Sequence, residues 1–350
     1  MRAISLVASF TCVLLAQELT AQMSADTGKT GWDAKRPVMA SACESGCPWG
    51  ELGDFVKESL RPLGYDVILC RNCNRWYGPQ LVSEHDYPPP LDEINLRDGV
   101  TERVNARVDF GVTSSAMLSA AFNGKLANKG PFRNLRLIAK LEDPFYYLIA
   151  VRKESGIRDL AQVKRHHLAV RILGADSNLA TILQYYGLTA DSINSWGGKL
   201  NVRPEEAQRG EFDIFAGFLA SPSLNPESSL WTTLSQKFDL YFLELPEDLL
   251  KRIARQNVDA EFVEVHPALL RGVDRRIKTL GRSGESIFAR DDAPEQCAYD
   301  LAKAIDEHHG ALKWFIRVYT YDPRTVWQNF GVPLHPGAER YYREAGHIKD

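Results

Sequence analysis

The sequence predicts an α/β protein made of two lobes, each built on a mainly parallel sheet. Three observations lead to this prediction. Segments whose apolar residues recur at helical spacing alternate with short runs of β-forming residues along most of the chain. The chain has 350 residues, which suggests about two domains of roughly 150 residues each. Its 44% of hydrophobic and 25% of charged residues are ordinary for a globular protein with a large core.

The N-terminus has the pattern of a secretory signal. A positive start is followed by the apolar residues 3–16 and then by small residues at 19–21. This run is shorter than the about 20 residues that span a bilayer, and polar Gln17 ends it, which disfavours a membrane anchor or a buried first helix. We therefore expect a signal peptide over residues 1–21, a disordered polar leader over residues 22–36, and a periplasmic location.

The expected elements follow one another in a regular order. A strand over residues 37–42 precedes a helix that begins at Pro48 and stops at Gly64, and a strand over residues 65–69 follows. A strand, a helix and a strand in succession imply parallel pairing. Further helices are expected over residues 100–108, 116–122, 179–186, 204–209, 246–256 and 294–308. Further strands are expected over residues 110–113, 135–141, 146–152, 167–172, 212–215 and 239–245, with strand-like pieces over 278–290.

The loops that follow these strands are the expected ligand-binding regions, because open α/β sheets bind ligands at the carboxyl ends of their strands. Their polar and aromatic residues are the candidates: Ser45, Trp49, Arg75, Trp76, Tyr77, Ser114, Ser115, Gly174, Asp176, Ser177, Asn178 and Ser221. The serines and residues 174–178 would supply hydrogen bonds, Arg75 could pair with a carboxylate, and the aromatic rings could stack on a ligand. We expect lobe one to comprise residues 37–150 and 285–350, and lobe two residues 151–284.

Residues 174–178 are the most suggestive of these loops. A glycine and small polar residues before a helix leave backbone N–H groups that can bind an anion. The alternative is helix capping by Asp176 or Ser177, which needs no ligand.

Four cysteines, Cys43, Cys47, Cys70 and Cys73, follow the first two strands and could lie close together. In an oxidising compartment they predict two disulfides with three possible pairings. A tetrahedral zinc site and a redox-active pair are the alternatives. Cys297 lies in a helix among apolar residues and is expected to be a buried free thiol.

Charge and motifs exclude several other functions. A net charge of −3 gives no reason to expect nucleic acid as a partner. The sequence shows no Ser-His-Asp order, no Gly-x-Ser-x-Gly and no phosphate-loop lysine. We therefore expect a binding protein without a cofactor. The rival hypothesis is an exported metal- or redox-dependent enzyme built around the four cysteines.

Several stretches resemble the TAXI-type solute receptors of TRAP transporters. They are residues 103–112 with the two serines that follow, residues 147–160 and residues 168–177. The tail, residues 332–344, reads Val-Pro-Leu-His-Pro-Gly-Ala-Glu-Arg-Tyr-Tyr-Arg-Glu and is similar to that family's ending. The resemblance implies the bilobal type II fold of periplasmic binding proteins, a ligand held between the lobes, and a TRAP-type membrane permease as partner.

The loops after the first two strands depart from the pattern of that family. Cysteines and tryptophans replace its Gly-rich loop with a tyrosine and its Gly/Ser-rich loop with an asparagine. The ligands known for the family, dicarboxylates and amino acids such as glutamate, are therefore not carried over. The sequence predicts an exported solute-binding protein that captures a small polar, anionic molecule for TRAP-type uptake.

Overall fold

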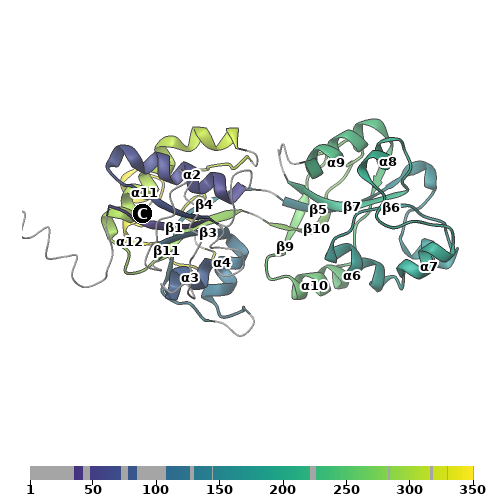
Figure 1. The fold of residues 1–350 in the computed structure, drawn as a ribbon, viewed down its shortest axis with the longest axis horizontal. Helices are drawn as coiled ribbons and strands as arrows, with labels where there is room; N and C mark the ends of the chain where they lie inside the picture. The colour runs from purple at the N-terminus through teal and green to yellow at the C-terminus, as the bar shows by residue number, and fades with distance from the viewer. Residues whose placement is uncertain are drawn as a thin grey trace, which may run out of the picture.

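The computed structural model describes residues 35–41, 48–71, 78–84, 108–126, 130–143, 145–220, 226–282, 284–315, 318–328 and 330–349. These residues form two α/β lobes, each with one sheet (Figure 1). The predicted bilobal α/β architecture is therefore confirmed.

Lobe one is a five-stranded sheet between two layers of helices. The strand order is β2-β1-β3-β11-β4. The strands are β1 (Val38–Ser41), β2 (Ile68–Arg71), β3 (Phe110–Ser114), β4 (Leu135–Leu141) and β11 (Glu285–Arg290). The helices are α2 (Pro48–Leu60), η1 (Arg61–Leu63), α3 (Gly78–Glu84), α4 (Ser115–Phe122), α11 (Glu295–His308), η3 (His309–Trp314) and α12 (Pro336–Glu344). Helices α2, α11 and α12 share one apolar cluster with the sheet, while α3 and α4 share another on its opposite face (Figure 1).

Lobe two has the same layered plan around a six-stranded sheet. The strand order is β6-β7-β5-β10-β9, and β8 also pairs with β5. The strands are β5 (Phe145–Arg152), β6 (Ile172–Leu173), β7 (Ile214–Ala220), β8 (Leu240–Phe242), β9 (Glu261–Val265) and β10 (Ile277–Arg282). The helices are η2 (Lys153–Ser155), α5 (Ala161–Arg165), α6 (Ser177–Tyr185), α7 (Ala190–Ser195), α8 (Pro204–Gln208), α9 (Pro226–Lys237) and α10 (Glu247–Gln256). Helices α6 and α10 cover one face of the sheet, and α8 and α9 cover the other.

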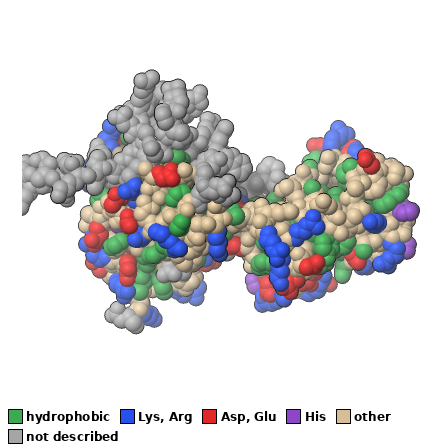
Figure 2. Space-filling model, turned by 90° about the horizontal axis from the view of Figure 1, so that it is seen from below, with side chains coloured by type: hydrophobic (Ala, Val, Ile, Leu, Met, Phe, Trp, Pro, Cys, Tyr) green, Lys and Arg blue, Asp and Glu red, His purple; other side chains and the backbone are tan. Residues whose placement is uncertain are grey.

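In the order of the described elements, the chain passes between the lobes twice. It leaves lobe one after β4 and returns between β10 and β11, and Figure 2 shows the lobes as distinct bodies that meet at a narrow waist. The predicted boundary at residue 150 is placed too late, because the whole of β5, from Phe145, belongs to the second sheet. Apolar periodicity marks a strand but does not say which sheet the strand joins.

The expectation of mainly parallel sheets is wrong for the described strands. Pairings β1–β2, β1–β3 and β6–β7 are parallel, whereas the other pairings between these named strands are antiparallel. The two crossings explain much of the difference. Strand β11 enters lobe one from lobe two and runs antiparallel to both its neighbours, and β10 runs back beside β5. Parallel pairing needs a crossover that returns the chain to the same edge, and these connections do not provide one.

The tail motif is structural. His335 is buried and caps α12, with its Nδ1 accepting from the backbone N–H of Gly337 at 3.2 Å. The hydroxyl of Tyr342 donates to the carbonyl oxygen of Ile138 on β4 at 3.0 Å, which ties α12 to the sheet. The C-terminal helix is thereby fixed to lobe one.

Burial of His335 predicts a pH-dependent stability. Burial lowers the pKa of this histidine from its usual 6.5. The unfolded chain therefore takes up a proton as the pH falls below about 6.5, whereas the folded protein resists it, so stability is full above that pH and declines below it. Urea unfolding at pH 7 and pH 5 measures this loss. His335→Asn, which can still cap the helix, should lose less stability between these two pH values; an unchanged pH dependence would contradict the assignment.

Candidate functional site

Part of the predicted site lies outside the described residues. This applies to Ser45, Arg75, Trp76, Tyr77 and Ser221, and to the cysteines Cys43, Cys47 and Cys73. Cys70 lies at the end of β2, and the two disulfides expected of the four cysteines stay a prediction. Cys297 is buried and free, as predicted. Trp49 is half-buried on α2 and packs against the core of lobe one.

The two predicted serines at the end of β3 face different partners. Ser114 is buried and caps α4, accepting from the backbone N–H of Met117 at 3.2 Å. Its hydroxyl also donates to the carboxylate of Asp259, which belongs to lobe two. The hydroxyls of Ser115 and Ser286 lie 2.9 Å apart within lobe one. Ser114 is therefore the member of this pair that reaches across the waist.

Residues 174–178 form a helix cap in the structure. One carboxylate oxygen of Asp176 accepts from the backbone N–H groups of Asn178 and Leu179 at 2.8 and 2.9 Å, as the capping alternative expects. Gly174 has φ +134°, and a Cβ there would lie 2.4 Å from the carbonyl oxygen of Ala216, so the turn requires glycine. Ser177 is exposed, whereas Asn178 is buried.

Tyr147 holds this cap in place. Its hydroxyl donates to both carboxylate oxygens of Asp176, at 3.1 and 3.2 Å. Burial, and then the charge of Asp176, raise the pKa of Tyr147 well above its usual value, so the hydroxyl stays protonated and remains a donor. The N-terminus of α6 is thus locked to β5 beside the waist.

A cavity of about 130 Å³ lies at the end of lobe two that is nearest the waist. It is lined by residues of lobe two alone: Phe145, Asn178, Phe218, Asn257, Asp259, Ala260, Leu280, Gly281 and Arg282. The rings of Phe145 and Phe218 stack with centroids 4.7 Å apart. Two of these residues connect the cavity to lobe one, since Asp259 accepts from Ser114 and Arg282 pairs with Glu285.

Arg282 is the central charge of this cavity. Its Nη1 lies 3.4 Å from an oxygen of Asp259 and 3.4 Å from an oxygen of Glu285, and its guanidinium carbon lies 4.4 Å from the ring centroid of Phe145. Burial alone would lower the pKa of Arg282, but the carboxylates of Glu285 and then Asp259 outweigh burial and raise it. The guanidinium is therefore a permanent cation beside a small, partly aromatic cavity.

The sequence prediction included Ser114 and Asn178 but missed Arg282, Asp259, Phe145 and Phe218. Phe145 and Arg282 lie at the ends of β5 and β10 that lead across the waist, whereas Phe218 lies in β7 and Asp259 in the turn between α10 and β9. The available signal was the polar Arg-Ser-Gly-Glu at residues 282–285, which separates two strand-like pieces. Identifying such a break as a hinge requires knowing that the two pieces belong to different sheets.

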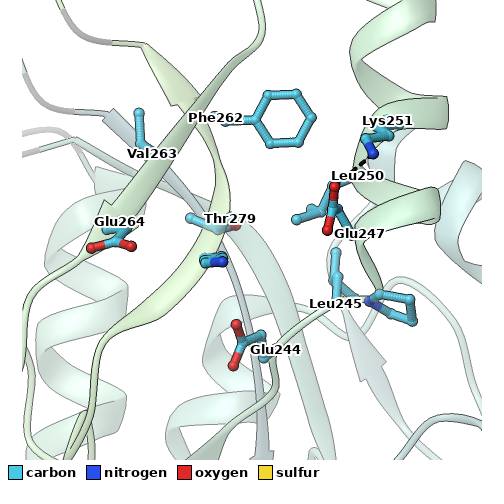
Figure 3. A pocket seen from close by; sticks show the side chains of 11 residues that line it. Glu244, Leu245, Glu247, Leu250, Lys251, Phe262, Val263, Glu264 and Thr279 are labelled. Atoms are coloured by element: carbon cyan, nitrogen blue, oxygen red, sulfur yellow. Dashed lines mark ion pairs between the residues drawn. The ribbon is translucent and has the colours of Figure 1, made fainter.

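A larger cavity, about 900 Å³, lies between α10 and the strands β9 and β10 (Figure 3). Phe262, whose surface is 55% exposed, points into it, and Lys251 pairs with Glu247 at 2.6 Å on the α10 side (Figure 3). The lining residues of both cavities belong to lobe two, but those of the larger cavity include none of the predicted site residues. The smaller cavity is the better candidate, because it includes Asn178 and because its Asp259 and Arg282 contact residues of lobe one.

No group of three or more His, Cys, Asp or Glu residues within the described part of the chain could hold a metal ion. No helix within it is long and apolar enough to cross a membrane.

Comparison with known families assigns the chain at a coarse level. The model of the NMT1-like family matches residues 100–346, which is more than half of the sequence. The chain belongs to the NMT1-like family. This is a family of solute-binding proteins, and the fold is the predicted bilobal α/β one. The narrower resemblance to TAXI-type receptors stays a prediction.

The solved structures that are similar to this NMT1-like protein have low sequence identity and low TM-scores. A TctC solute binding protein from Polaromonas shares 11% identity, with 91% of this chain and 100% of that chain covered and a TM-score of 0.40. PhnD1 from Prochlorococcus marinus in complex with methylphosphonate shares 12%, with 90% and 100% covered and a TM-score of 0.39. XAC2383 from Xanthomonas citri bound to ATP shares 14%, with 89% and 97% covered and a TM-score of 0.38. With scores this low, the assignment rests on the family match.

Proposed function

We propose that this protein is an exported solute receptor that holds a small polar, anionic molecule at the waist between its lobes. The observation that carries the proposal is the cavity at the end of lobe two, whose residues Asp259 and Arg282 contact Ser114 and Glu285 of lobe one. Membership of a family of solute-binding proteins supports it. Reversible capture, rather than chemistry, is the proposed activity.

The geometry suits capture by closure of the lobes. The connections β4–β5 and β10–β11 join the two lobes covalently at the waist. Changes in the backbone φ and ψ angles of these connections can therefore rotate one lobe relative to the other. A solute in the cavity would meet the side chains of Asn178 and Arg282 from lobe two and the hydroxyl of Ser114 from lobe one. Small-ligand sites of this kind combine apolar walls with a few placed polar groups.

Location and partner belong to the same proposal. The N-terminal pattern over residues 1–21 supports export to the periplasm, although that segment lies outside the described residues. A receptor in the periplasm would deliver its solute to a membrane permease, and the resemblance to TAXI-type receptors favours a TRAP-type permease.

A thermal-shift screen of small polar solutes tests the function. A solute at 100 times its Kd should stabilise the protein by about 2.7 kcal/mol. With the solute found, Asn178→Ala should weaken binding about tenfold, because it removes a polar group that lines the cavity. Ser177→Ala is the matched control: this neighbouring side chain is exposed, so its loss should leave the affinity unchanged.

The opposite result for these two variants would place the binding site elsewhere. If Ser177→Ala weakens binding and Asn178→Ala does not, the solute lies against the outer side of the α6 cap. If no solute in a broad screen shifts the melting temperature, the receptor function itself is wrong.

A further inference from the structure

The two carboxylates that pair with Arg282 differ in their freedom to leave it. Glu285 is 1% exposed and begins strand β11, where it pairs with both Ser114 and Leu141 in the sheet. Asp259 is 25% exposed and lies in the turn between α10 and β9, outside any helix or strand. A turn residue at the rim can swing into water, whereas a buried strand residue cannot.

The contact between Asp259 and Arg282 is also loose. Their closest atoms are 3.4 Å apart, which is longer than the about 2.7–2.9 Å of a charge-assisted hydrogen bond. A carboxylate that is free to orient itself can approach a guanidinium in the bidentate geometry, with two short parallel hydrogen bonds. A bound anion could therefore pair with Arg282 better than Asp259 does.

We propose that Asp259 is an internal competitor for the ligand site, and that a solute carboxylate binds by taking its place on Arg282. The inference rests on the proposed receptor function and names the ligand class for the same site. Exchange of one carboxylate for another keeps the charge beside Arg282 constant. It also releases the Ser114 hydroxyl, which now donates to Asp259, to donate to the solute.

The cavity limits the size of that solute. Its volume of about 130 Å³ is close to that of the roughly 150 Å³ cavity that accommodates benzene in another protein. Phe145, Phe218 and Leu280 supply apolar walls, and Asn178 and Asn257 each supply an amide group. These walls fit a monocarboxylate with a short chain or one small ring, and they leave a long dicarboxylate without a second cationic partner among the described lining residues.

Isothermal titration of the full mature chain tests the competition. The probes are propanoate and benzoate, with propanamide and benzamide as uncharged controls of the same shape. Asp259→Asn removes the competing charge and should raise the affinity for both carboxylates about tenfold, while the amides bind neither protein. Asp274→Asn is the control, since Asp274 also pairs with an arginine, Arg275 at 3.2 Å, but is 76% exposed and lies outside the cavity.

The outcomes separate this inference from the receptor function. Equal carboxylate affinity of the parent protein and the Asp259→Asn variant would overturn the competition. No carboxylate binding to either protein would overturn the ligand class, and the receptor function would still stand if the wider screen finds another solute. Asp259→Ala, titrated in parallel, should show the same gain, and thermal unfolding shows that each variant is folded.

Discussion

Arg282→Met is expected to lower the free energy of unfolding by about 3 kcal/mol or more. The substitution leaves the carboxylate of Glu285, which is 1% exposed, without its 3.4 Å guanidinium partner. Removing one member of a buried ion pair costs more than the pair itself contributes, because the remaining charge stays out of water. The midpoint of urea unfolding should fall accordingly. The same variant should also lose binding of any anionic solute.

Two further variants test the cause of that loss. The double variant Arg282→Met/Glu285→Gln removes both charges and should recover much of the stability. Arg276→Met removes an exposed arginine that pairs with Glu264 at 3.3 Å, and it should cost less than about 1 kcal/mol. If Arg282→Met and Arg276→Met have equal effects, Arg282 does not act as a buried cation.

The order of elements could be predicted well where apolar periodicity is strong. The helix expected over residues 294–308 is α11 (Glu295–His308), and the strand expected over 135–141 is β4. Elements with a weak or short apolar pattern could be predicted less accurately. The strand expected over 167–172 is reduced to β6 (Ile172–Leu173), because His167 has φ +50° and cannot continue a strand. The edge strand β9 (Glu261–Val265) was missed within a stretch rich in charge.

The sequence could not predict which strands share a sheet. For the same reason, it could not predict all residues of the candidate site. Local patterns predicted Ser114 and Asn178, because each follows a strand and opens a helix. Arg282 and Phe145 are opposite each other on β10 and β5, far apart in sequence, and they become neighbours through strand pairing alone. A charge in a strand looks like a solvent-facing residue until its partners are known. The pairing of β10 with β5, rather than local secondary-structure propensity, places Arg282 at the centre of the cavity.

Gly281→Ala is expected to disrupt the same pairing and to cost about 3 kcal/mol. Gly281 lies in β10 between Tyr146 of β5 and Glu261 of β9. A Cβ there would lie 1.7 Å from the carbonyl oxygen of Phe145 and 2.8 Å from Cγ2 of Val263. The carbonyl belongs to the backbone, so no side-chain rotation relieves the clash. Strand β10 must separate from β5 next to the cavity, and solute binding should weaken together with stability.

Gly217→Ala provides the matched control in the same sheet. Gly217 lies in β7, and a Cβ there would lie 3.5 Å from Cε2 of Phe215, an ordinary contact distance. Both substitutions add one methyl group to a strand glycine, so any difference between them reports the close approach at Gly281. Urea unfolding should show a large loss for Gly281→Ala and a change within about 0.5 kcal/mol for Gly217→Ala. Equal stability of the two variants would show that β10 can move away from β5 at little cost, and the waist would then be a loose connection rather than a tightly packed pair of strands.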